Sequence, residues 1–79
     1  MVISALVLML APDPERRARV LAELAGDPRL SLGELVRDRL PIVAESGSAG
    51  EGTTLCDELA DRDGVVRVDV VSIDFEEDA

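Results

Sequence analysis

Few side chains of this sequence are of a type that could catalyse a reaction. The 79 residues include 17 acids and 8 arginines but no His, Lys, Asn, Gln, Trp or Tyr. The usual general base, the Schiff-base amine and the common forms of the serine or cysteine triad are therefore missing. The adjacent acids Asp57 and Glu58 cannot share one helical face or one strand face, and neither can Glu76 and Glu77. We expect no catalytic residue and no enzymatic activity.

The sequence also lacks the ligands of a typical metal site. Cys56 is the single cysteine, and without histidine a lone thiol offers no soft site. No acidic loop has the spacing of calcium ligands. A disulfide within the chain is impossible, so we expect Cys56 to be a small buried residue on a helix. No metal and no cofactor is expected.

The charge of the chain restricts its partners instead. A net charge of -9 repels nucleic acid and anionic membranes and favours a basic partner. Asp74, Glu76, Glu77 and Asp78 supply four of the negative charges, and residues 74–79 are expected to form a frayed acidic tail. At 79 residues the chain is predicted to be a single domain, residues 1–79.

The first predicted element is a strand, Val2–Leu10 (VISALVLML), that is apolar at every position except Ser4. It is too short to span a membrane, which needs about 20 apolar residues, and no positive residue precedes it as in a signal peptide. We therefore expect a soluble, cytoplasmic protein without membrane insertion. Alternate side chains of a strand point to opposite faces, so this strand needs cover on both faces. Two short helices can cover only one face, which leaves the other for a partner.

The rest of the first half predicts a helix and a hairpin. Asp13 can cap a helix that starts at Pro14 and stops at Gly26. Its arginines at positions 16, 17 and 19 are interpreted as a solvated face. Residues 30–36 and 40–46 predict the two strands of a hairpin, with Gly33 marking a bulge in the first of them.

The second half predicts a connector, a second helix and a last strand. Residues 46–52 (SGSAGEG) are interpreted as a flexible glycine-rich connector. The second helix is expected to start near Thr53 or Thr54, since Thr54 and Asp57 have the spacing of a capping box, and to end before Gly64. The last strand, residues 65–75, alternates at first and then becomes apolar on its second face.

The predicted order, β-α-β-β-α-β, is that of a ferredoxin-like α+β fold. Right-handed crossovers place both helices on one face of a four-stranded antiparallel sheet, with the first and third strands in the centre. Continuing the alternation along the strands assigns nine residues to the open face: Ser4, Leu6, Leu8, Val43, Glu45, Arg67, Asp69, Val71 and Ile73. Replacing Leu6 by Glu is then expected to abolish binding with the fold intact, and replacing Val7 to do the reverse.

Three stretches of the chain resemble the NapD family of small cytoplasmic chaperones: ISALVL at the start, LSLGELVRDRLPIVAES in the hairpin and DGVVRVDVVSIDFEED at the end. The similarity covers nearly the whole chain and concerns length, strand order, the apolar start with serine and the acidic tail. The chain departs from the family at Pro41, where the strand is usually continuous, and at Leu8, where a polar residue is common.

The resemblance implies a chaperone that binds a twin-arginine signal peptide. The peptide belongs to the precursor of the periplasmic nitrate reductase catalytic subunit, or of a similar exported molybdoenzyme, and export is delayed until the cofactor is loaded. The residues independently suit a basic, apolar helix, with Leu6, Leu8 and Val71 for its apolar side and Glu45 or Asp69 for its arginines. Weak self-association through an empty open face is also expected.

Two alternatives have the same strand order. A ligand-sensing domain resembling the ACT family would pair its sheets side by side and bind an amino acid at the interface. An enzyme resembling acylphosphatase would need an asparagine to position water, and the sequence has none. RNA recognition would need stacking aromatics and positive charge, whereas Phe75 is the single aromatic residue.

Overall fold

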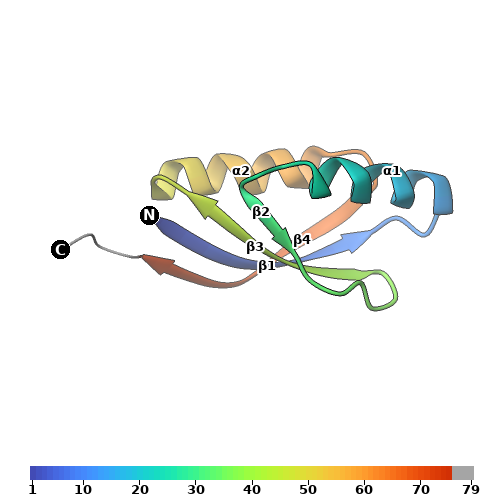
Figure 1. Cartoon of the computed structure of the whole chain (residues 1–79), viewed down its shortest axis with the longest axis horizontal. Coiled ribbons are helices and arrows are strands. Elements are labelled where there is room, and N and C mark those ends of the chain that lie inside the picture. The colour runs from blue at the N-terminus through green and yellow to red at the C-terminus, as the bar shows by residue number, and fades with distance from the viewer. Residues whose placement is uncertain (76–79) are drawn as a thin grey trace.

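The computed structural model describes residues 1–75 and confirms the ferredoxin-like α+β fold. The elements follow in the order β1 (Val2–Leu10), α1 (Pro14–Ala25), β2 (Leu30–Leu32), β3 (Arg39–Ser46), α2 (Ala49–Asp61) and β4 (Val65–Phe75). The strands form one antiparallel sheet in the order β2-β3-β1-β4. Both helices lie on the same side of the sheet, and no described element lies below it (Figure 1).

Helix α1 begins where the sequence predicts. The Asp13 carboxylate accepts a hydrogen bond of 3.0 Å from the backbone N–H of Glu15, and Pro14 occupies the first turn. Asp13 satisfies a backbone donor that has no partner within the helix, and Pro14 has no N–H to satisfy. The predicted cap and start are confirmed, and Gly26 follows the last helical residue.

Helix α2 begins four to five residues before the expected start, because the capping box is formed by other residues. The Ser48 hydroxyl accepts from the N–H of Glu51 at 3.2 Å, and the Glu51 carboxylate accepts from the N–H of Gly47 at 2.9 Å. These two bonds satisfy donors at the helix start, so most of the expected connector is helical despite its glycines. The Thr53 and Thr54 hydroxyls instead donate to carbonyls of the preceding turn.

Strand β2 is shorter than expected, and Gly33 ends it rather than forming a bulge inside it. The Gly33 N–H donates to the Pro41 carbonyl at 2.8 Å. A Cβ on Gly33 would lie 2.8 Å from Cγ and 3.1 Å from the carbonyl oxygen of Pro41, so the close approach of the chain to Pro41 requires glycine. Beyond it, Val36 and Arg39 form an isolated bridge that closes the turn into β3.

The hydrophobic core lies between the sheet and the helices, and it contains the face of β1 that the sequence analysis assigned to a partner. Leu6 and Leu8 are 1% and 0% exposed. They pair with Ile42 and Leu40 of β3, which are also buried. The helices add four buried side chains to the same layer: Val20, Leu24, Leu55 and Leu59.

The two faces of β1 are therefore exchanged relative to the expectation. The alternation itself was predicted correctly, but the direction was wrong, because the branched leucines fill the layer under the helices. Leu6→Glu is then expected to unfold the protein rather than to spare the fold.

The C-terminal strand is longer than the frayed-tail prediction allows. Strand β4 includes Asp74, which pairs with Ile3, so the expected frayed tail cannot start at residue 74. The rest of that tail, residues 76–79, lies outside the described residues. Within residues 1–75 no helix has the length and apolar character needed to cross a membrane.

Candidate functional site

The open face of the sheet consists of cross-strand rows, each centred on a residue of β1. Strand pairing puts residues of β3, β1 and β4 side by side in four rows: Glu45, Ile3 and Asp74; Val43, Ala5 and Ser72; Pro41, Val7 and Asp69; Arg39, Met9 and Arg67. Residues directly opposite one another in a sheet point to the same face and are close enough to act together. The rows therefore form one continuous surface on the side away from the helices.

An apolar stripe runs along the middle of this face. It consists of Ile3, Ala5, Val7 and Met9, each of which is partly exposed although β1 is a central strand. Val43 widens the stripe on one side with 40% of its surface exposed, and Val71 widens it on the other with 65%. Side chains of this kind are normally covered, so a contiguous stripe of them marks an interaction surface.

Val71 reaches the open face through a β-bulge. The pairing of β1 with β4 shifts between Ala5 and Leu6, so that Ser72 faces Ala5, Val70 faces Leu6, and Val71 is the extra residue between them. Val71 lines a shallow hollow together with Val7, Met9 and Asp69. The bulge also changes the alternation beyond it, and Ile73 consequently faces Ser4 on the helix side.

The ends of the stripe carry opposite charges. At the Ile3 end stand two carboxylates, Glu45 and Asp74, both exposed and without an ion-pair partner within residues 1–75. At the Met9 end stand two guanidinium groups, Arg39 and Arg67.

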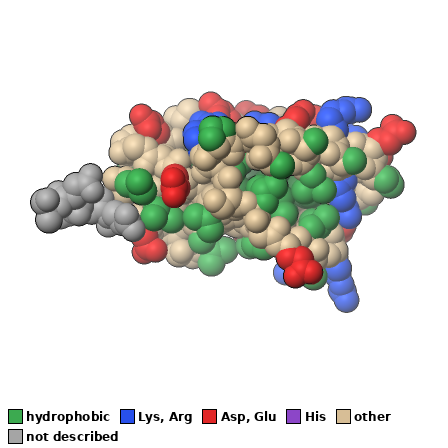
Figure 2. Space-filling view, viewed as in Figure 1, with side chains coloured by type: hydrophobic (Ala, Val, Ile, Leu, Met, Phe, Trp, Pro, Cys, Tyr) green, Lys and Arg blue, Asp and Glu red, His purple; other side chains and the backbone are tan. Residues whose placement is uncertain are grey.

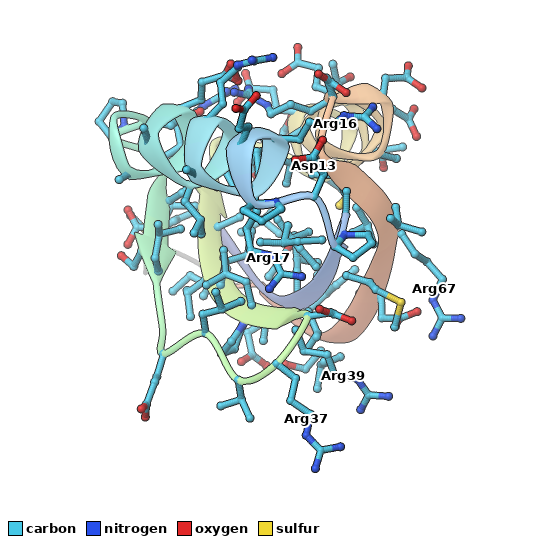
Figure 3. All side chains as sticks on the ribbon, turned by 90° about the vertical axis from the view of Figure 1, so that its right-hand side faces the viewer. Asp13, Arg16, Arg17, Arg37, Arg39 and Arg67 are labelled. Atoms are coloured by element: carbon cyan, nitrogen blue, oxygen red, sulfur yellow. The ribbon has the colours of Figure 1, made fainter. Side chains whose placement is uncertain are left out.

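The basic end extends into the turn before β3. Arg37 occupies that turn with a positive φ of 56°. Figure 3 shows Arg37, Arg39 and Arg67 pointing away from the helices at this end of the molecule, and Figure 2 shows blue side chains projecting at the lower right corner. The three arginines make this end of an otherwise acidic protein cationic.

Asp69 is already engaged within the protein. Its carboxylate accepts hydrogen bonds from Nη2 and Nε of Arg67 at 2.8 and 3.2 Å. These bonds, and then the charge of the carboxylate, raise the pKa of Arg67. Glu45 and Asp74 are therefore better placed than Asp69 to receive a cation of a partner.

The structure divides the nine predicted site residues between the two faces. Five lie on the open face as expected: Val43, Glu45, Arg67, Asp69 and Val71. Four lie on the helix side, contrary to expectation: Ser4, Leu6, Leu8 and Ile73. The sequence reasoning missed the β1 stripe of Ile3, Ala5, Val7 and Met9, together with Arg39 and Asp74. The leucines could have indicated the right direction, because they match Leu40 and Ile42 in size and branching.

Two side chains outside the open face differ in burial from the expectation: Arg17 is less exposed, and Cys56 is only partly buried. Arg17 is half-buried rather than solvated, since Nε donates to the Ala11 carbonyl at 3.1 Å and Nη2 pairs with Asp38. It ties α1 to the turn before β3. Cys56 lines a hollow between α2 and the sheet, where burial, and then the charge of Asp57, raises the pKa of the thiol.

The arrangement on the open face is suited to binding. Within residues 1–75 no group of three or more His, Cys, Asp or Glu side chains is placed to hold a metal ion. Comparisons of the chain with protein-family models, with curated proteins and with solved structures find no match. The apolar stripe with a charged group at each corner is the structural feature that bears on function.

Proposed function

We propose that the protein is a chaperone that binds a basic, amphipathic signal-peptide helix on the open face of its sheet. The observation that carries the proposal is the apolar stripe on β1, which lies between two other strands and yet has no cover within residues 1–75. Burying the stripe under an apolar helix face would remove it from water, and this would supply most of the affinity.

The stripe has the length of a short helix. Six residue steps separate Ile3 from Met9, which corresponds to about 20 Å along a strand. A helix spans that distance with about 13 residues, or between three and four turns. A helix with apolar residues at every third or fourth position can therefore lie along the whole stripe.

Charge favours a basic peptide. The chain has a net charge of -9, and the uncompensated carboxylates Glu45 and Asp74 border the stripe. Such charges speed the encounter with a cationic partner and reject anionic ones. Arginines are well suited to these carboxylates because a guanidinium group can donate two hydrogen bonds to one carboxylate.

The resemblance of three stretches of the chain to the NapD family narrows the proposal. It supports a twin-arginine signal peptide as the partner, carried by the precursor of the periplasmic nitrate reductase catalytic subunit or of a similar molybdoenzyme. In this proposal the protein acts in the cytoplasm, itself catalyses nothing, and delays export until the cofactor is loaded.

Titration calorimetry with a synthetic leader peptide tests the proposal. We expect saturable binding at micromolar protein that weakens as the salt concentration rises, because part of the attraction is electrostatic.

Val7→Glu, which puts a charge in the middle of the stripe, should abolish binding and leave the circular dichroism spectrum unchanged. Ala60→Glu, at an exposed position of α2, is the matched control and should bind normally. No saturable binding, or equal binding by Val7→Glu, would refute the proposal. A dimer stabilised against heat by a free amino acid would favour the ACT-like alternative.

A further inference from the structure

The open face carries opposite charges at its two ends: one end is anionic and the other is cationic. Glu45 and Asp74 flank Ile3, whereas Arg39 and Arg67 flank Met9. The two ends are separated by about 20 Å of strand, which is more than twice the Debye length of about 8 Å at physiological salt. Each end therefore acts on the nearest part of a bound molecule.

Neighbouring charges do not cancel this pattern. Arg29 lies beside Glu45, but its guanidinium group is already held by Asp27 at 2.7 Å and by Glu58 at 3.7 Å. Met1 also lines the hollow beside Glu45, but so does a further carboxylate, that of Glu51, which offsets the positive charge of the Met1 amino group.

The nearest carboxylates at the opposite end are occupied in the same way. Asp38 is paired with Arg17, and Asp69 is paired with Arg67. Arg37 and Arg39 have no ion-pair partner within residues 1–75. The basic end therefore keeps a cationic excess that a partner can use.

A helix has a matching asymmetry. Its N-terminus carries partial positive charge from unpaired N–H groups, and its C-terminus carries partial negative charge from unpaired carbonyls. The N-terminus is favoured near Glu45 and Asp74, and the C-terminus is favoured near Arg37 and Arg39. Cationic side chains in the first turns of the peptide would add to the same preference.

We propose that the open face binds its helix in a single direction, parallel to β1, with a cationic N-terminal end at Glu45 and Asp74 and the C-terminal end at the arginines. The inference rests on the proposed function and specifies the kind of ligand. The ligand is a helix of about 13 residues whose basic residues precede its apolar stripe. The same peptide with its cations at the other end would place them against Arg39 and Arg67.

Two synthetic peptides of identical composition test the direction. One carries two arginines before an amphipathic helical stretch, and the other carries the same arginines after it. We expect the first to bind at least about tenfold more tightly, since both the side chains and the helix ends then meet opposite charges, with each helix-end contact worth about two- to fivefold.

Paired variants of the protein sharpen this test. Asp74→Arg together with Glu45→Arg should lower the affinity for the first peptide and raise the affinity for the second, so that the preference for the first peptide shrinks or reverses. The control, Asp61→Arg with Asp57→Arg, makes the same change in net charge at exposed positions of α2 and should shift both peptides equally. Equal affinity of the two peptides for the unaltered protein would overturn the inference.

A spin label gives the direction without relying on affinity. A nitroxide at the N-terminus of the first peptide should broaden the amide signals of Ile3 and Glu45 and leave those of Met9 and Arg39 sharp. Broadening at the Met9 end, or at both ends equally, would show that the helix is reversed or binds both ways. In that case the proposed function stands and the direction fails, whereas the absence of binding by both peptides would refute both.

Discussion

The two faces of β1 are both apolar, but one is buried under the helices and the other is partly exposed. Leu6 and Leu8 are sealed under the helices at 1% and 0% exposure, whereas Val7 and Met9, their neighbours in sequence, remain partly exposed. The difference lies in what each face meets: buried leucine and isoleucine of β3 on one side, and Pro41, Val43 and charged residues on the other. Apolar character alone does not separate a core face from a binding face, but the cross-strand partners of each face do.

The largest expected effect comes from the covered face. Leu8→Ala should lower the free energy of unfolding by about 3–5 kcal/mol, because a cavity remains in a closely packed layer. Val7→Ala should cost about 1 kcal/mol or less, since that side chain has no cover. Urea denaturation of the two variants measures the difference directly. Similar losses would show that both faces are packed in solution, which would contradict the open face.

A second test uses Gly64, in the turn between α2 and β4. Gly64 has a φ of +96°, and a Cβ there would lie 3.0 Å from the Val20 side chain. Gly64→Ala should therefore destabilise the protein by about 1–3 kcal/mol through backbone strain and crowding. Gly50→Ala is the matched control: Gly50 lies in α2, where a Cβ would meet only Oγ of Ser48 at 3.9 Å, an ordinary van der Waals contact, and the change should stabilise the protein by about 0.5–1 kcal/mol. A thermal melt that ranks the two variants the other way would contradict the structure.

The start of α2 provides a smaller effect. Ser48→Ala removes the acceptor for the Glu51 N–H and should cost about 1 kcal/mol of stability. Thr54→Ala, at the position where the sequence predicted the cap, should change stability by less than about 0.5 kcal/mol. Peptide affinity should be unaffected in both variants, because α2 lies on the other side of the sheet. A larger loss for Thr54→Ala would mean that the helix begins later in solution.

The smallest expected effect depends on pH. Hydrogen bonds from Arg29 hold the pKa of Asp27 below its usual value of 3.8. A carboxyl whose pKa is lowered by folding stabilises the protein above its ordinary value, and this contribution is lost as the pH falls through the folded pKa. Stability should therefore fall less steeply between about pH 5 and pH 2 in Asp27→Asn than in the unaltered protein. If stability fell equally steeply with pH in both proteins, the hydrogen bonds between Arg29 and Asp27 would not stabilise the folded state.

The order of the elements could be predicted from the sequence, because local signals marked each of them. Asp13 with Pro14 marks the first helix, and the alternation of β1 is strong. The start of α2 was missed because Gly50 and Gly52 suggested a flexible loop, whereas Ser48 and Glu51 cap a helix there. A local capping signal outweighed the intrinsic preference of glycine.

The candidate site could be predicted only in part, because a face is a tertiary property. The charged residues Glu45 and Arg67 were placed correctly by alternation along their own strands. The direction of β1 was wrong, since alternation defines two faces without saying which one the helices cover. Ile73 was misplaced because the bulge at Val71 shifts the alternation, and such a bulge has no simple sequence signal.

The bulges of β4 also bear on how a sheet with an open face avoids growing into a fibre. Strand β4 is 11 residues long and lies at the edge of the sheet, where unpaired backbone groups can template another strand. Extra residues at Val66 and Val71 interrupt its pairing with β1, so its regular stretch between the bulges covers only residues 67–70, two of which are charged. A strand added to this edge could pair regularly with only a few residues before a bulge shifted its register. The protein can thus keep one face available to a helix while its edge discourages the stacking of copies that leads to amyloid.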